Sequence, residues 1–287
     1  MKTVLRLAVQ KSGRLSESSL ALIRECGIKF SPTGKGKLMT RAANFPLELL
    51  FLRDDDIPGY VADGVADLGI VGENVMVEKN KHIATAKKLG FSKCRLSLAI
   101  PKGETYNGID YFQGASVATS YPHILEQYLS GQGVKADIHE ISGSVEIAPG
   151  IGLAKGICDI VSSGSTLMSN GLKEVEVVMR SEAVMVASPS LSDEKRTLLD
   201  QLLFRIDSVQ NGKNHKYVLL NAPNEAIERI IDILPGMKSP TVMPLASAGW
   251  SSIHSVMKED EFWEVIESLR EAGAEGILIV PIEKMIL

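Results

Sequence analysis

Short apolar segments typical of strands alternate with helical segments along nearly the whole chain. Residues 3–10 alternate in polarity and lead, after a turn, into a helix predicted over residues 16–26, with Ser16 as its N-cap and Gly27 as its end. The same order recurs at residues 117–119, a strand followed by a helix that begins at residues 120–123. This alternation predicts an α/β fold with mostly parallel sheets, in which ligands bind at the carboxyl ends of the strands.

The chain has 287 residues, which is long for a single core and predicts two or three compact units. A strand over residues 94–100 is expected to cross into a second lobe, and two successive strands over residues 175–187 are expected to return. A long amphipathic helix follows from about residue 192 to residue 209, and Asn211-Gly212 is expected to mark its end. The predicted division is lobe I at residues 1–95 and 176–190, lobe II at 96–175, a connecting helix at 191–213 and a last domain at 214–287.

The last domain has the most regular order of elements. Strands are predicted at residues 216–221, 241–245, 253–257 and 276–281, and helices at residues 224–234 and 261–272. Pro235-Gly236 is expected to close the first helix, and Gly273 the second. The order β-α-β-β-α-β is that of the ferredoxin-like split unit. By analogy of fold alone, such a module attached to an enzyme often senses a small ligand.

Charge and cysteine usage exclude several classes of protein. Lys and Arg total 31 against 35 Asp and Glu, a net charge of -4, whereas a general nucleic-acid binder needs a basic surface. Arg6 and Lys11 interrupt the apolar stretch that a signal peptide would need, and no apolar run approaches the length of a membrane span. Cys26, Cys94 and Cys158 lack paired or metal-type spacing and are expected to be reduced. We therefore expect a cytoplasmic protein without nucleic-acid or membrane partners.

The stretch GICDIVSSGSTLMSNGL at residues 156–172 is the main candidate for a ligand site. A short apolar strand carries one acid, Asp159, and is followed by the small residues Ser162, Ser163, Gly164, Ser165 and Thr166. Such a strand-loop-helix unit turns backbone N–H groups toward an anion, and a carboxylate at the strand end suits the two hydroxyls of a ribose. The alternative is an ordinary turn with a serine N-cap, and the loop alone favours neither interpretation.

Two other strand ends carry cations. Lys11-Ser12-Gly13-Arg14 follows the first strand and predicts either a phosphate site or a solvated turn. Arg53 follows the strand over residues 47–53 and precedes the acids of residues 54–56, which suit a helix start better than a metal site because adjacent side chains point in different directions.

The segment ADLGIVG at residues 66–72 reads as an apolar strand with Asp67 in front of it and Glu73 at the start of the next helix. Gly69 and Gly72 indicate a close approach of the backbone to a ligand or to a neighbouring element. Tyr121 is expected either to stack on a base or to pack internally. His123 has no ligand partner at metal spacing, so capping or packing is the better interpretation.

Several stretches together match one family in order and spacing. They are QKSGRL at 10–15, RDDDIPG at 53–59, DLGIVGENV at 67–75, CRLSLA at 94–99, ATSYPHIL at 118–125, the Ser-Val-Glu segment at 142–146, CDIVSSGSTLMSNGLKEVEV at 158–177, SPTVMPLA at 239–246 and ILIVPIEKM at 277–285. The chain resembles the long form of ATP phosphoribosyltransferase, the first enzyme of histidine biosynthesis. The resemblance covers essentially the whole chain; each stretch alone is weakly specific, and the set is very specific.

This resemblance implies an enzyme that joins ATP to 5-phosphoribosyl 1-pyrophosphate and releases pyrophosphate, with a dependence on Mg²⁺. It further implies a catalytic part with two lobes like a periplasmic binding protein and a C-terminal ferredoxin-like regulatory domain that binds L-histidine as a feedback inhibitor. Members of the family form homo-oligomers, from active dimers to inhibited hexamers.

The resemblance also assigns residues. Asp159 would hold the ribose hydroxyls, residues 162–166 would hold the 5-phosphate, and Glu146 is a weaker candidate for the same cleft. Lys11 and Arg14 are assigned, with Asp159, to catalysis. The ATP-binding set is Lys11, Gly13, Arg14, Arg53, Asp67, Gly72, Glu73 and Tyr121. No metal ligand is assigned, because Mg²⁺ usually travels on substrate oxygens.

Four positions match the histidine pocket of the family: Asn221, Thr241, Val256 and Gly276. Asn221 departs from the acid that some relatives carry. Its amide can hydrogen-bond the amino group of the ligand but lacks the charge, so the affinity for histidine is open. The alternative is that all four are ordinary strand residues of a packed interface.

The sequence leaves three alternative functions, each with a feature that argues against it. An ordinary purine or pyrimidine phosphoribosyltransferase usually carries two adjacent acids before its loop, whereas Asp159 stands alone. A two-lobed solute-binding protein would need export. An inactive regulatory paralogue would not need Lys11, Arg14, Asp159 and Thr166.

Overall fold

The computed structural model describes residues 3–31, 38–234, 236 and 240–287. Two of the residues considered above, Pro235 and Ser239, lie outside these ranges. The chain divides into two compact units, one of Met1–Ala21 and Ile28–Leu199, the other of Leu22–Gly27 and Asp200–Leu287. None of the helices in the described ranges combines the length and the apolarity that crossing a bilayer requires.

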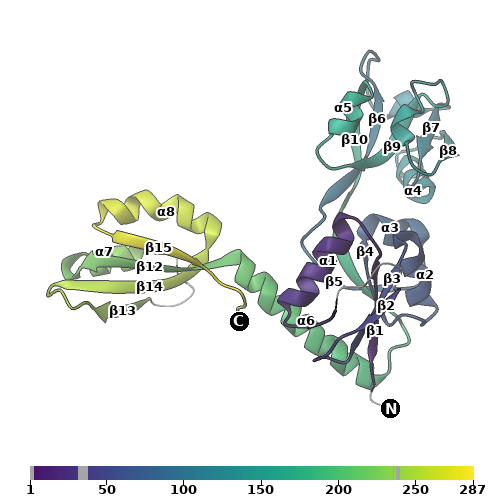
Figure 1. Ribbon diagram of the computed structural model, residues 1–287. Helices are drawn as coiled ribbons and strands as arrows, with labels where there is room; N and C mark the ends of the chain where they lie inside the picture. Colours follow the sequence, from purple (N-terminus) through teal and green to yellow (C-terminus); the bar gives the residue numbers. More distant parts are fainter. Residues whose placement is uncertain (1–2, 32–37, 235, 237–239) are drawn as a thin grey trace. The chain divides into compact units, whose positions relative to one another are not determined.

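The first unit contains two sheets (Figure 1). One has the strand order β2-β3-β1-β4-β11-β5. Its strands are β1 (Leu5–Gln10), β2 (Met39–Arg41), β3 (Leu47–Leu52), β4 (Leu68–Gly72), β5 (Ala84–Lys88) and β11 (Ala183–Ala187). Its helices are α1 (Arg14–Glu25), η1 (Asp54–Asp56), α2 (Ile57–Ala62) and α3 (Glu73–Lys79). Strand β1 pairs in parallel with both β3 and β4, so these three strands end at the same edge of the sheet.

Helix α1 begins at Arg14, two residues before the predicted N-cap Ser16. Gly13 adopts a φ of 96°, and its carbonyl accepts the N–H of Glu17 at 3.1 Å. Glycine takes this left-handed conformation without steric strain, so the turn closes at Gly13 and leaves Ser16 buried within the first helical turn.

The other sheet of the first unit has the order β10-β6-β9-β7-β8. Its strands are β6 (Cys94–Pro101), β7 (Ser116–Thr119), β8 (Asp137–Glu140), β9 (Gly156–Val161) and β10 (Leu172–Ser181). Its helices are η2 (Ile109–Phe112), α4 (Pro122–Gly131), η3 (Val145–Ile147) and α5 (Ser165–Ser169). Buried side chains that include Leu98, Phe112 and Leu125 form its core.

Both sheets are mixed rather than mostly parallel. Strand β6 is antiparallel to β9 and β10, and β11 is antiparallel to β4 and β5. These strands carry the chain from one sheet to the other, so no helical crossover imposes a parallel direction on them. Strand β10 stays in the second sheet to Ser181, and the chain re-enters the first sheet at Ala183, later than the expected boundary at residue 176.

The second unit contains a four-stranded sheet with the order β13-β14-β12-β15, in which every pairing is antiparallel. Its strands are β12 (His215–Pro223), β13 (Thr241–Pro244), β14 (Trp250–Lys258) and β15 (Glu275–Pro281), and its helices are η4 (Asn224–Ala226), α7 (Ile227–Ile233) and α8 (Glu259–Glu271). Alternate residues such as Val218 and Leu220 pack with Phe262 and Leu269 beneath the helices. The predicted βαββαβ order, and the α/β fold class with it, are confirmed.

Helix α6 (Asp193–Asn214) contributes residues to both units and is longer than the sequence predicted. Asn211-Gly212 does not end it. Instead, the C-terminal tail crosses the helix at Gly212, where a Cβ would lie 2.8 Å from the carbonyl oxygen of Ile282 and 2.9 Å from backbone atoms of Glu283 and Lys284. The N–H of Met285 also donates to the carbonyl of Ser208 at 2.8 Å. The glycine is therefore a packing site for the tail.

We expect Gly212→Ala to lower the free energy of unfolding by about 1–3 kcal/mol, because the added Cβ meets fixed backbone atoms. Gly131→Ala is the matched control, since Gly131 also lies in a helix but has no atom within 4 Å of an added Cβ. It should be neutral or stabilising by up to about 1 kcal/mol. Urea denaturation measures both variants, and equal effects would show that the tail does not depend on Gly212.

Candidate functional site

Cations gather at the carboxyl edge of the first sheet. The N–H of Lys11 donates to the carbonyl of Leu52 at 2.8 Å, so the ends of β1 and β3 place Lys11 beside Arg53. Arg14 opens helix α1 immediately after this point. All three side chains are exposed to solvent.

The end of β4 reaches the same edge, but its residues also have structural partners. A Cβ on Gly72 would lie 2.4 Å from Oδ1 of Asn74, so the glycine leaves room for that buried amide. Glu73 pairs with Lys88 of β5 at 3.2 Å. At Gly69 a Cβ would lie 2.6 Å from Cγ2 of Ile57, which shows that this glycine serves helix packing rather than a ligand.

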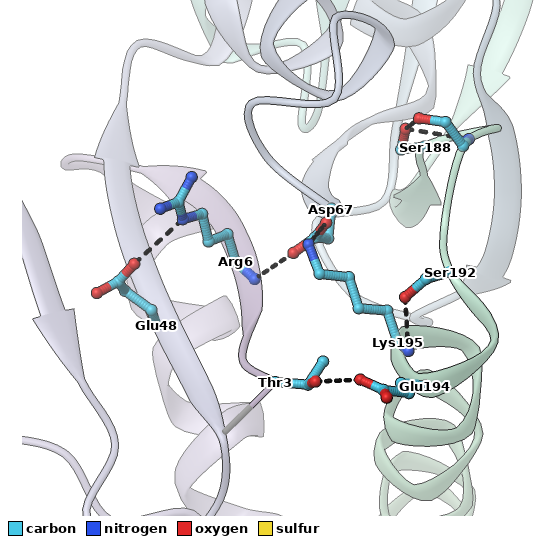
Figure 2. A network of polar contacts seen from close by, with 9 residues as sticks. Thr3, Arg6, Glu48, Asp67, Ser188, Ser192, Glu194 and Lys195 are labelled. Carbon is cyan, nitrogen blue, oxygen red and sulfur yellow. Dashed lines mark hydrogen bonds and ion pairs between the residues drawn. The ribbon is translucent and has the colours of Figure 1, made fainter. Parts of the chain in front are cut away.

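Asp67 lies at the opposite end of β4 from this edge. Figure 2 shows its carboxylate between β1 and helix α6, where it accepts the N–H of Arg6 at 2.8 Å and pairs with Nζ of Lys195 at 2.7 Å. The Asp67 side chain is only 7% exposed. The structure therefore does not bring Asp67 to Lys11 and Arg53. Its strand-start position and its filled hydrogen bonds correct the prediction that it lines the ATP site.

The loop after β9 forms a polar pocket of about 300 Å³. Gly164 adopts a φ of 82° before α5, and the hydroxyls of Ser163 and Ser165 lie 3.0 Å apart. The structure brings Arg14 and Glu146 to this loop. The lining is Arg14, Glu146, Ile160, Val161, Ser162, Ser163, Gly164, Ser165, Thr166 and Leu167.

Asp159 precedes the lining residues and is partly buried. Burial raises the pKa of its carboxyl to about 6, the Ile160 N–H bonded to Oδ1 at 2.7 Å opposes this shift, and the negative charge of Glu146 adds to it. A partly buried carboxylate of this kind can accept hydrogen bonds from ligand hydroxyls.

Tyr121 lies at the start of α4 and packs against the apolar clusters of both sheets. Burial raises the pKa of its phenol, and the charge of Asp159 raises it further, while a hydrogen bond with the side chain of Asn74 lowers it. Of the two interpretations offered by the sequence, this environment favours a packed aromatic. His123 makes a ring contact with Gln127 at 3.1 Å, and its backbone N–H donates to Glu78.

Asn221, Thr241 and Val256 lie on the sheet face of the second unit that α7 and α8 leave uncovered. Strand alternation puts Val218 and Leu220 in the core, so their neighbours Tyr217 and Asn221 face the other way. Val256 pairs with Tyr217, and Thr241 with His254, across the strands. Gly276 is next to Asn221, since its Cβ would lie 3.3 Å from Nδ2 of that amide.

Three polar residues of this open face were missed by the sequence reading. The phenol of Tyr217 lies 2.6 Å from Nδ1 of His254, and the hydroxyl of Ser252 lies 3.0 Å from Nε2 of the same ring. The available signal was the period of two along residues 250–258, which sets Ser252, His254 and Val256 on one face. Nothing in the sequence alone showed which strand lies beside β14.

Within the described ranges, no group of three or more His, Cys, Asp or Glu side chains is arranged to hold a metal ion. Glu146 lines the loop pocket, and its negative charge acts on Asp159.

Comparisons with known proteins give one consistent result. A family model described as ATP phosphoribosyltransferase (HisG) matches residues 53–208, and the model of the HisG C-terminal domain matches residues 212–284. The chain is 65% identical over 286 residues to a Cytophaga hutchinsonii protein named ATP phosphoribosyltransferase, which covers 100% of both chains. It is 60% identical over 284 residues to a Phocaeicola vulgatus protein of the same name, covering 99% of this chain and 100% of that one.

Solved structures match the chain as well, and one of them comes from the same family. It is titled as the ATP phosphoribosyl transferase (HisG:HisZ) complex from Thermotoga maritima. The match has 28% identity and a TM-score of 0.61, and it covers 71% of this chain and 96% of that one.

We expect Asp159→Asn to raise the free energy of unfolding at pH 8 by about 1–3 kcal/mol. The folded-state pKa of about 6 lies above the ordinary aspartate value of 3.8, so the charged carboxylate is less favourable in the folded chain at high pH. The stability linked to this group is present at low pH and is lost as the pH rises through about 6, so the gain should be about half as large at pH 5. Urea denaturation at both pH values measures it. The control is Glu140→Gln, at an exposed acid of the same sheet, which should leave the free energy of unfolding unchanged at both pH values. A loss of stability in Asp159→Asn at both pH values would contradict the burial argument.

We expect Lys195→Met to destabilise the fold by about 2–4 kcal/mol, because it leaves the Asp67 carboxylate buried without its cation. The double variant Asp67→Asn/Lys195→Met should recover much of this loss. Arg6→Met is the control, since the Arg6 side chain is 55% exposed and its pair with Glu48 is worth at most about 1 kcal/mol. Thermal and urea unfolding measure the stability of each variant. Equal losses in Lys195→Met and Arg6→Met would show that the ion pair of Asp67 and Lys195 contributes no more than an exposed pair.

Proposed function

Because the chain belongs to the ATP phosphoribosyltransferase family, we propose that it transfers the 5-phosphoribosyl group from phosphoribosyl pyrophosphate to ATP. The products are phosphoribosyl-ATP and pyrophosphate, and the reaction is the first step of histidine biosynthesis. The observation that carries this proposal is the full-length match to proteins of that name at 65% and 60% identity. The pocket that joins Arg14 to residues 160–167 supports it. We expect the enzyme in the cytoplasm.

The reaction needs alignment and charge stabilisation rather than a protein nucleophile, because a ring nitrogen of adenine displaces pyrophosphate at the anomeric carbon. The loop of Ser162, Ser163, Gly164, Ser165 and Thr166 holds the 5-phosphate. Its hydroxyls and its backbone N–H groups supply donors, and the left-handed Gly164 lets the backbone bend around the phosphate.

Asp159 accepts hydrogen bonds from the ribose hydroxyls. This role requires the ionised carboxylate, since protonation turns one of its two oxygens into a hydrogen-bond donor. With a pKa of about 6 in the unliganded chain, the group is ionised at neutral pH. Its negative charge also stabilises the positive charge that develops on the ribose as the leaving group departs.

The exposed cations Lys11, Arg14 and Arg53 offset the charge of the triphosphate and of the departing pyrophosphate. Gly13, Gly72 and Glu73 belong to the same edge, and Tyr121, at the start of α4, packs against the apolar cluster of the first sheet. Gly72 and Tyr121 act through the buried side chain of Asn74, which both contact.

Mg²⁺ fits the acids and the polyphosphate substrates of this site. It would ride on substrate oxygens with water, as this ion prefers, and Asp159 and Glu146 are the residues that would face it. When bound, it neutralises phosphate charge. Lys11, Arg14 and Arg53 then need to balance only the phosphate charge that Mg²⁺ does not neutralise.

We propose that L-histidine binds to the four-stranded sheet of the second unit, on the face that α7 and α8 leave uncovered. The residues next to it are Asn221, Thr241, Val256 and Gly276. The polar group of Tyr217, Ser252 and His254 adds hydrogen-bonding atoms to this face. Asn221 offers an amide oxygen to the amino group of the ligand. A homo-oligomer, from dimer to hexamer, is part of the same proposal.

The test is an absorbance assay of phosphoribosyl-ATP formation from ATP and phosphoribosyl pyrophosphate with Mg²⁺, with and without L-histidine. We expect turnover that histidine suppresses. Turnover that is insensitive to histidine would support the proposed reaction and contradict the proposed histidine site. Folded protein without turnover would favour the alternatives, a two-lobed small-ligand-binding protein or an inactive regulatory paralogue.

Asp159→Asn provides the matching test of the loop. We expect turnover to fall at least about 100-fold, because the neutral amide cannot accept both ribose hydroxyls or balance the developing charge. Glu140→Gln should keep full turnover. Full turnover in Asp159→Asn would remove the ribose role from this residue.

A further inference from the structure

Helix α4 of the second sheet is capped by a residue of helix α3, which belongs to the first sheet. The two carboxylate oxygens of Glu78 accept the backbone N–H groups of His123 and Ile124, each at 3.0 Å. These N–H groups lie in the first turn of α4, where no intrahelical acceptor exists. Tyr121, at the N-cap position, makes no side-chain capping bond. Glu78 therefore supplies the cap from another element.

This contact decides where an anion can bind. Helix α4 follows β7, a neighbour of β9, and the start of such a helix is a common phosphate site in parallel sheets. Here the carboxylate of Glu78 already occupies the start of α4, and its negative charge disfavours a phosphate at that place. The phosphate is thereby left to the loop of residues 162–166, which follows the adjacent strand β9.

A second contact joins the same two helices one turn away. Asn74 lies four residues before Glu78 on α3, hence on the same face, and its side chain hydrogen-bonds the phenol of Tyr121. The hydroxyl of Ser181 donates to Oδ1 of Asn74 at 2.8 Å and accepts the N–H of Asn74 at 3.1 Å. Asn74 and Ser181 are 4% and 5% exposed, and Ser181 ends β10, the strand that leaves the second sheet.

Fixing the start of α4 also fixes the strand end beside Asp159. The N–H of Tyr121 donates to the hydroxyl of Thr119 at 2.9 Å, and the hydroxyl of Ser120 donates to the carbonyl of Ile141 at 2.6 Å. Thr119 ends β7 and pairs with Cys158, the residue before Asp159. A shift of α4 against α3 thus moves β7 and β9 together.

We propose that Glu78 is a positioning residue for phosphoribosyl transfer: by holding the N-terminus of α4 on α3, it sets Asp159 and the phosphate loop against the cations that follow β1 and β3. The proposal rests on the proposed function. Glu78 touches neither substrate, and it acts through the contact between helices.

The test compares Glu78→Ala with Glu126→Ala, a control at an exposed acid on α4. We expect kcat to fall about 10- to 100-fold in Glu78→Ala, because a small displacement of the loop misaligns the reacting atoms. The dissociation constant for ATP, measured by calorimetry without phosphoribosyl pyrophosphate, should stay within about twofold, because the cations assigned to ATP follow strands of the first sheet and Tyr121 keeps its hydrogen bond to Asn74 on α3. Glu126→Ala should change neither quantity. A kcat within twofold of the unmodified chain in Glu78→Ala would overturn the proposal.

A second variant separates positioning from simple helix capping. Glu78→Ala/Pro122→Glu returns negative charge to the N-terminus of α4 from within α4 itself. We expect it to regain the melting temperature lost in Glu78→Ala while kcat stays low. If kcat returns together with the melting temperature, Glu78 is only a cap and the positioning role is wrong.

A third measurement does not depend on turnover, so it distinguishes failure of this inference from failure of the proposed function. Hydrogen exchange of the backbone amides of His123 and Ile124, the two groups that Glu78 accepts, should accelerate at least about tenfold in Glu78→Ala and stay unchanged in Glu126→Ala. Unchanged exchange in Glu78→Ala would refute the contact itself, whatever reaction the protein performs.

Discussion

The parallel pairing of β1 with β3 and β4 is the constraint on which the rest of the candidate site depends. Parallel strands run in one direction, so the segments that follow them emerge at one edge. That edge receives Lys11, Arg53 and Gly72 from three distant parts of the sequence. Residues at the starts of these strands lie at the opposite edge of the sheet. Asp67 immediately precedes β4, and its carboxylate anchors helix α6 through Lys195.

Local patterns in the sequence predicted the elements and much of the candidate site. The turn of Lys11-Ser12-Gly13-Arg14 and the loop after Asp159 are contiguous, and each follows an apolar strand, so both were recognisable without any partner. The same reasoning failed at Asp67 because polarity next to a strand does not say at which end of the sheet the residue lies. It failed at Gly212 because glycine after asparagine usually ends a helix, and only the distant tail explains why this one does not.

The contacts that join distant segments were beyond sequence reasoning. Glu78 reads as one more acid in the last turn of a short helix, and its partners are backbone N–H groups, which leave no signature in side-chain chemistry. Tyr217, Ser252 and His254 come together only because β12 and β14 pair in a particular register. Such groups depend on tertiary pairing, which a single sequence does not encode in any local pattern.

The position of the C-terminal tail has a consequence for how the chain is made. Strand β12 is hydrogen-bonded on one side to β14 and on the other to β15, and the tail beyond β15 closes over Gly212. Every one of these partners is synthesised after β12 and α6. Since domains form in order as the chain leaves the ribosome, the first unit has all its strands while the second is still incomplete. The flank of α6 at Gly212 and the edges of β12 therefore stay uncovered until the last residues have been synthesised. A truncated product would expose both to the chaperones and proteases of the cell.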